Sequence, residues 1–269
     1  MNLFQMFSYP FMQRALIAGV LVSLCAALLG VSLVLKRYSM IGDGLSHVSF
    51  GALAIAVALG FTPLYFSIPV VILAAFLLLR VADHPRWNAD AAIAVMSASS
   101  LAVGIMVISL TTGMTTDVDN YMFGSVLAMT KTDVVLAVVL CIAVLILFIL
   151  FYHKLFAVTF DENFSRATGL NVRRYNALLA ILTALTIVLG MRMMGAMLIS
   201  SLVIFPALTA MRLFKSFRGV IISAACTSVF CFITGLGFSF ACSTPVGATV
   251  VSANLILFLT ACAYRFFRP

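Results

Sequence analysis

The chain has 269 residues, of which 64% are hydrophobic and only 9% charged, and its mean hydropathy is +1.21. Soluble domains carry about 25% charged residues, so this composition excludes an ordinary soluble domain and predicts an all-α bundle of membrane helices, with one transmembrane domain over residues 1–269. A net charge of +8 would suggest a nucleic-acid partner in a soluble protein, but here the positions of the basic residues matter more than their sum.

Nine apolar segments approach the roughly 20 residues that a membrane-spanning helix needs. In chain order they cover residues 15–35, 41–61, 64–79, 91–110, 134–151, 176–190, 195–211, 220–240 and 247–264. Only residues 191–194 separate the sixth segment from the seventh, so eight or ten spans are the alternatives. The first segment has no small-residue cleavage site after it, which predicts a retained helix rather than a signal peptide.

The loops between these segments differ sharply in basic residues. One alternating set holds thirteen and the other set holds only Arg14, Lys131 and Arg192. Because basic loops stay in the cytoplasm, the first set is predicted to be cytoplasmic, with the N-terminus outside and the C-terminus inside. The thirteen are Lys36, Arg37, Arg80, Arg86, Lys154, Arg166, Arg173, Arg174, Arg212, Lys215, Arg218, Arg265 and Arg268.

Asp43 and His47 lie four residues apart at the start of the second segment, so one helix face carries both side chains. Small residues at Gly51, Ala54 and Ala58 continue that face and predict close packing in the bundle interior. A carboxylate and a neutral imidazole suit zinc or manganese, although two ligands do not fill a coordination shell. The alternative is that Asp43 caps the helix. Spacing alone leaves both interpretations open.

Two loops are long enough to do more than connect spans. The outer loop, residues 111–132, contains Asp117 and Asp119, which could attract cations or could be ordinary solvated side chains. The inner loop, residues 153–175, contains a predicted short amphipathic helix, with Asp161 or Asn163 as its cap and Gly169 at its end. This helix is either a connector or a docking element.

Other side-chain groups favour packing roles. Met191, Met193, Met194 and Met197 could bind Cu(I), but methionine at a helix junction is more often adaptable packing. The six cysteines show no C-x-x-C pair and are interpreted as reduced packing residues. The chain contains no P-loop, H-E-x-x-H or G-x-S-x-G motif, which argues against a P-loop ATPase, a zinc protease and an α/β-hydrolase.

The stretch from Leu33 to Ser49, LVLKRYSMIGDGLSHVS, resembles the signature of the permease subunits of zinc and manganese uptake ABC transporters. The likeness continues in order through residues 121–125, 159–162, 167–170, 195–200, 206–210 and 243–247, so it covers nearly the whole chain. The opening residues 11–16 look most like the zinc branch from Gram-positive bacteria.

This resemblance implies a homodimeric permease in a bacterial cell membrane, with two separate ATPase subunits inside and a metal-binding protein docking outside. Residues 161–169 match the family's coupling helix, which implies that Asp161, Glu162, Ala167 and Gly169 contact the ATPase. Asp43 and His47 match the motif that handles the cation. Family members often carry a carboxylate before the Thr-Pro pair, where this chain has Ser243. Ser243 and Asp119 are therefore second-tier candidates for the metal path.

The resulting hypothesis is an ATP-driven importer of Zn²⁺, with Mn²⁺ as the second candidate, no cofactor of its own and no enzymatic activity in this chain. The alternative is a secondary carrier or channel that works without an ATPase. Inverted repeats would favour that alternative, and the sequence shows no convincing internal repeat. An intramembrane enzyme or a carrier of chelated metal is less favoured, because ionisable partners are few and small transport sites suit bare ions.

Overall fold

The computed structural model describes residues 9–82, 89–111 and 131–267, and the described chain is a bundle of helices without strands. Within those ranges nine helices are long and apolar enough to cross a membrane, which confirms the predicted fold class. The helices are α1 (Pro10–Leu35), α2 (Ile41–Ala58), α3 (Pro63–Ala82), α4 (Ala89–Thr111), α6 (Lys131–Leu150), α7 (Tyr152–Phe160), α8 (Glu162–Ala167), α9 (Val172–Met194), α10 (Ala196–Leu213), α11 (Phe217–Cys242) and α12 (Val246–Phe267).

The helix ends follow local sequence rules. Pro10 stands in the first turn of α1, and the side chains of Asn171 and Ser216 cap α9 and α11 by accepting hydrogen bonds from backbone N–H groups. The junction of α9 and α10 differs from the prediction, because the four residues expected to connect them are helical. Met and Arg propagate a helix well, and the break falls at Gly195, whose φ of +87° is inexpensive only for glycine.

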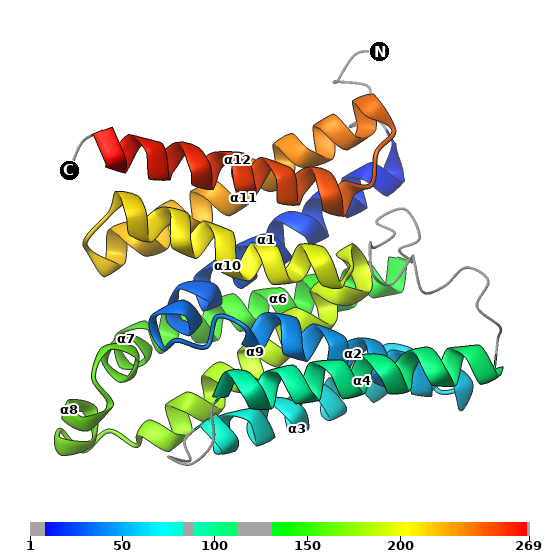
Figure 1. Cartoon of the computed structure of the whole chain (residues 1–269), viewed down its shortest axis with the longest axis horizontal. Coiled ribbons are helices and arrows are strands. Elements are labelled where there is room, and N and C mark those ends of the chain that lie inside the picture. The colour runs from blue at the N-terminus through cyan, green and yellow to red at the C-terminus, as the bar shows by residue number, and fades with distance from the viewer. Residues whose placement is uncertain (1–8, 83–88, 112–130, 268–269) are drawn as a thin grey trace.

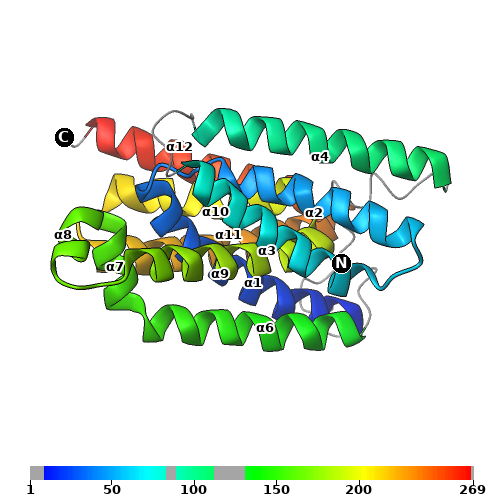
Figure 2. The same cartoon turned by 90° about the horizontal axis from the view of Figure 1, so that it is seen from below.

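The nine long helices are not equally buried. In α1, α2 and α9 72% of the most apolar stretch is buried, against 17% in α4 and 22% in α12. Figure 2 accordingly shows α4 and α6 at opposite edges of the bundle, with α1 and α9 between them. The side chains that α4 exposes include Val95 and Leu110, so this outer surface is as apolar as lipid requires.

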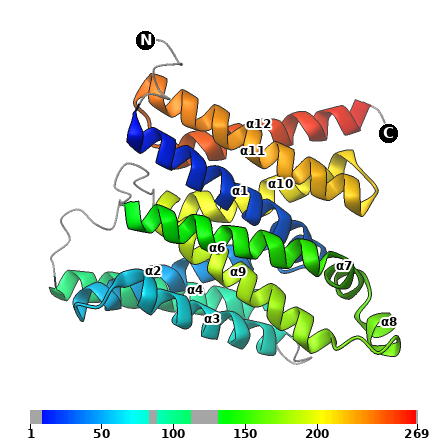
Figure 3. The same cartoon turned by 180° about the vertical axis from the view of Figure 1, so that it is seen from behind.

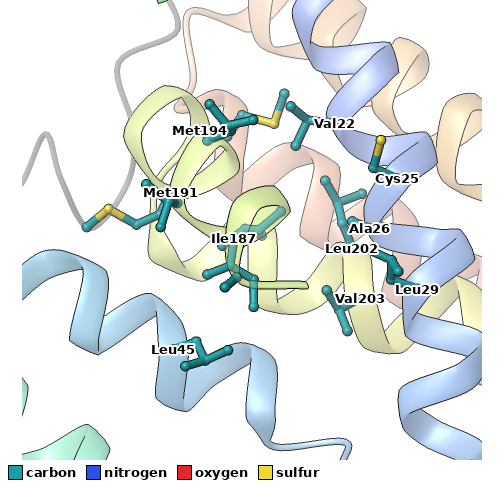
Figure 4. Packing of buried hydrophobic residues seen from close by; sticks show 14 of the residues in the cluster. Val22, Cys25, Ala26, Leu29, Leu45, Ile187, Met191, Met194, Leu202 and Val203 are labelled. Carbon is teal, nitrogen blue, oxygen red and sulfur yellow. The ribbon is translucent and has the colours of Figure 1, made fainter. Parts of the chain in front are cut away.

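Side chains from α1, α9 and α10 form the centre of the core (Figure 4). Val22 and Leu29 of α1 meet Ile187 of α9 and Leu202 of α10 there, and all four are almost completely buried. The backbones approach closely where glycine is present: a Cβ built on Gly30 would collide with the carbonyl oxygen of Val203. Gly30 therefore lets α1 and α10 approach to backbone contact, a role that small residues commonly have between membrane helices.

The methionine and cysteine groups take part in this packing. Met191, Met193 and Met194 are at most 2% exposed within the apolar cluster, whereas Met197 is half exposed. All six cysteines are free thiols. Cys25 of α1 donates to the backbone oxygen of Cys141 of α6 at 3.5 Å, so this thiol joins two helices rather than belonging to a disulfide.

The two ends of the bundle are distinct. The C-terminal end of α12 and the α7–α8 segment lie at one end, and the N-terminal end of α1 lies at the other (Figures 1 and 3).

The predicted short inner helix is present as α8, and it is preceded by a second short helix, α7, that the sequence interpretation missed. Asp161 is confirmed as the cap of α8, since its Oδ1 accepts the N–H of Phe164 at 2.9 Å. Gly169 follows α8 with a φ of +85°.

Candidate metal site and the α7–α8 segment

Asp43 and His47 project from the same face of α2, one turn apart. The Nε2 atom of His47 lies 3.6 Å from Oδ1 of Asp43, and the side chains are 17% and 41% exposed respectively. The pair is therefore partly sheltered yet still reachable. Asp43 lies in the first turn of α2, where the backbone N–H groups without helical partners favour its negative charge.

The capping interpretation of Asp43 is wrong. The residue at the N-cap of α2 is Met40, and no side chain there accepts a backbone N–H. Ser46 donates its hydroxyl hydrogen bond to the backbone carbonyl of Asp43 at 2.7 Å rather than to the carboxylate. The carboxylate of Asp43 is therefore not used to cap α2, and its Oδ1 atom lies near His47 instead.

A third polar atom comes from a distant part of the chain. The hydroxyl of Ser200, in the second turn of α10, has two acceptors within reach: Oδ1 of Asp43 at 3.5 Å and the carbonyl oxygen of Ala196 at 3.0 Å. Whichever acceptor the hydrogen faces, the Ser200 oxygen keeps lone pairs that can face an ion beside the carboxylate. Sequence reasoning missed this neighbour. Its only signal was that residues 195–200 belong to the resemblance.

The packing of α2 holds the pair in place. A Cβ on Gly51 would lie 2.7 Å from the carbonyl oxygen of Ser100, so α2 and α4 touch through their backbones. Gly42 faces the side chain of Val203 on α10, with ordinary contacts of 3.6 Å. The helix that carries Asp43 and His47 is thus fixed between α4 and α10.

The ligand set near the pair is small. Among the described residues no three or more His, Cys, Asp and Glu side chains gather as a metal cage. Asp119 lies outside the described residues. Ser243 lies at the exposed turn between α11 and α12, in the left-handed backbone region with a φ of 54°, and belongs to a different part of the bundle from α2. Two ligands and a hydroxyl suit an ion that must be released again, because a closed four-ligand site binds zinc structurally.

The α7–α8 segment presents a different chemistry. Phe160 and Phe164 are 59% and 63% exposed, and Asp161, Ala167 and Gly169 are also exposed. Exposed aromatic side chains outside the candidate spans are typical of a surface that a partner covers.

Glu162, by contrast, faces inwards. Its Oε1 accepts hydrogen bonds from Nζ of Lys36 at 2.8 Å and from Nδ2 of Asn176 at 3.0 Å, and Arg166 lies 3.6 Å from its other oxygen. Burial raises the pKa of Glu162, but the hydrogen bonds from Lys36 and Asn176 and the charges of Lys36 and Arg166 outweigh it, so the pKa lies below its ordinary value.

At the opposite end of the bundle, Arg192 forms an ion pair with another helix. Its Nη2 atom lies 3.8 Å from Oδ2 of Asp133 on α6, with the two side chains 26% and 18% exposed. This ion pair joins the last turn of α9 to the first turn of α6.

A bundle of long apolar helices, with the Asp43–His47 pair at the start of α2 and a short helical segment at one end, has the architecture of a polytopic membrane protein. Ionisable pairs within such bundles are typical of transport proteins. The chain belongs to the ABC 3 transport family, whose model matches residues 8–265. It is therefore an ABC transporter permease, and the resemblance read from the sequence is confirmed.

Relatives of known name agree with this assignment. The chain is 31% identical to the high-affinity zinc uptake system membrane protein ZnuB of Haemophilus influenzae, covering 91% of this chain and 94% of the relative. It is 30% identical to the manganese transport system membrane protein MntC of Halalkalibacterium halodurans, covering 98% and 90%. The solved structure of PsaBC from Streptococcus pneumoniae in complex with Fab matches with a TM-score of 0.84 at 29% identity, covering 94% and 91%.

Proposed function

We propose that this chain is the permease of an ATP-driven importer of Zn²⁺, with Mn²⁺ as the second candidate, and that Asp43 and His47 bind the ion in transit. The observation that carries this proposal is the pair itself: a carboxylate and an imidazole 3.6 Å apart on one face of α2, only partly exposed. Ionisable groups are costly inside a membrane, and they mark transport pathways when they occur there.

The pair can bind and release a bare ion. The carboxylate of Asp43 supplies charge, Nε2 of His47 supplies a nitrogen ligand, and the hydroxyl of Ser200 supplies a third, weak oxygen donor. Such an incomplete set holds the ion loosely enough to pass it on. Nitrogen ligation favours Zn²⁺, and the relatives named above include both a zinc and a manganese system.

The rest of the proposal concerns assembly. Residues 1–269 form one permease domain, and two copies work together with two ATPase subunits. The ATPase docks on α8 at Asp161, Ala167 and Gly169, where Phe160 and Phe164 add exposed apolar area, and Glu162 anchors the same helix. A metal-binding protein docks at the opposite end, on the outer face of the cell membrane.

The test is metal uptake by the complete complex in liposomes, ion by ion, with and without ATP. We expect ATP-dependent Zn²⁺ uptake that Asp43→Asn and His47→Ala abolish, because each variant removes one of the two principal ligands. Both variants should still co-purify with the ATPase. Asp90→Asn is the matched control, since Asp90 is an exposed acidic residue in the first turn of α4. Normal uptake by both site variants would remove the site assignment, and uptake without ATP would favour a secondary carrier.

A further inference from the structure

Lys36, the first residue after α1, is a cation with almost no access to solvent. Its side chain is 6% exposed, and its Nζ donates to Oε1 of Glu162 at 2.8 Å and to Oδ1 of Asn176 at 2.5 Å. Asn176 in turn donates to the same oxygen of Glu162 at 3.0 Å. The three side chains, which we call the Lys36 ring, close a triangle between the end of α1, α8 and α9.

The Lys36 ring is the main polar attachment of α8 to the bundle. Only Ser165 is buried in this six-residue helix, so apolar packing contributes little to holding it in place. Removing one partner from a sheltered ion pair leaves the other charge without compensation, so the ring resists being pulled apart. A displacement of α8 therefore acts on Lys36.

Only six residues separate Lys36 from Asp43, and backbone hydrogen bonds constrain this segment. Tyr38 N–H donates to the carbonyl of Leu33 at 2.9 Å, and Ile41 N–H donates to the carbonyl of Tyr38 at 3.1 Å. Arg37, which lies between Lys36 and Tyr38, adopts a left-handed backbone conformation with a φ of 63°. These bonds make the connection a compact turn, and Asp43 lies in the first turn of the helix that follows.

We propose that Lys36 is a positioning residue that transmits movement of α8 to the start of α2, so that ATP hydrolysis in the partner changes the geometry at Asp43 and His47. This inference rests on the proposed function, because it assumes that α8 is the segment the ATPase moves. Lys36 binds neither the ion nor the nucleotide. It links the movement of α8 to the change in geometry at Asp43 and His47.

The experiment measures ATP hydrolysis and metal uptake together in liposomes that contain the complete complex. Lys36→Met keeps the length of the side chain but removes its charge and its hydrogen bonds. We expect this variant to hydrolyse ATP while the amount of Zn²⁺ imported per ATP falls on the order of tenfold, a size typical of coupling between sites. Lys36→Arg should restore most of the ratio, because it returns the charge and the donors.

Arg37→Met is the matched control, since Arg37 is the exposed cation next in the chain, and its ratio of uptake to hydrolysis should not change. A normal ratio for Lys36→Met, or an equal loss for Arg37→Met, would overturn the inference. If Lys36→Met prevents assembly, Glu162→Met decides instead, because it removes the carboxylate that joins α8 to Lys36 and leaves Lys36 itself in place. An unchanged ratio in that variant would also overturn the inference. Failure of the proposed function would give a different result from failure of this inference: the unmodified complex would take up metal without ATP.

Discussion

Glu162 illustrates how one side chain can be read in two ways. Its position in the segment matching a coupling helix implies contact with the ATPase, whereas the structure directs its carboxylate to Lys36 and Asn176. The two interpretations are compatible if Glu162 fixes the orientation of α8 and its exposed neighbours, such as Phe164, form the docking surface. A residue can thus belong to a docking helix without forming the docking contact.

The lowered pKa of Glu162 gives a pH prediction. A carboxyl group whose pKa is depressed by folding contributes stability that is fully present above its unfolded-state pKa, here 4.5, and that is lost as the pH falls through the lower folded-state value. We therefore expect amide hydrogen exchange in α8, corrected for its intrinsic pH dependence, to stay slow from neutral pH to about 5 and to accelerate at lower pH. Glu162→Gln should show no such step. An identical step in that variant would show that another group causes it.

Asp43 and His47 show what residue spacing predicts well. Their separation of four positions placed both on one helix face, and the structure has them 3.6 Å apart. Spacing said nothing about Ser200, which reaches the same carboxylate from 157 positions away in the chain. The local half of the candidate site was therefore predictable, and the half contributed by α10 was not.

At the scale of helices, α2 depends on glycine for its place in the bundle. Gly51 allows the backbone of α4 to approach, and Gly42 faces α10 at an ordinary distance. The two glycines lie on one helix but meet different neighbours, so they offer a controlled comparison.

Gly51→Ala should lower the free energy of unfolding by about 1–3 kcal/mol, because the new methyl group would lie 2.7 Å from the carbonyl of Ser100 and backbone atoms cannot rotate away. Gly42→Ala should have little effect, since its methyl group would meet Val203 at 3.6 Å. Unfolding of the purified protein in detergent, followed with denaturant, measures both. Equal destabilisation by the two substitutions would contradict the packing argument.

At the scale of the whole molecule, loops that are rich in basic residues lie at one end of the bundle. The loops that hold thirteen basic residues include the α7–α8 segment and the C-terminal residues of the chain. Figure 1 shows α7–α8 and the C-terminal end of α12 at the same end of the bundle, and the N-terminal end of α1 at the other end. This agreement supports the proposed orientation, in which α8 faces the cytoplasm.

Labelling of single cysteines tests that orientation. In a background without the six natural cysteines that still imports metal, Phe61→Cys should react with a membrane-impermeant maleimide in intact cells. Arg173→Cys should react only after the cells are opened. Phe61 and Arg173 are both exposed, and they lie at opposite ends of the spans formed by α2 and α9. The reverse pattern of labelling would invert the proposed topology and remove α8 from the ATPase side.

The sequence by itself determined the membrane class, the candidate spans within a few residues, the cap of α8 at Asp161 and the shared face of Asp43 and His47. Each of these depends on rules that act within one segment: the cost of placing charge in lipid, the helical period and the need to cap a helix end. The tertiary structure alone decided that Ser200 lies beside Asp43, that Arg192 pairs with Asp133, and that Lys36 holds α8 from 126 positions away. Such contacts follow from how helices pack against one another, and no spacing within a segment encodes the choice of a distant partner.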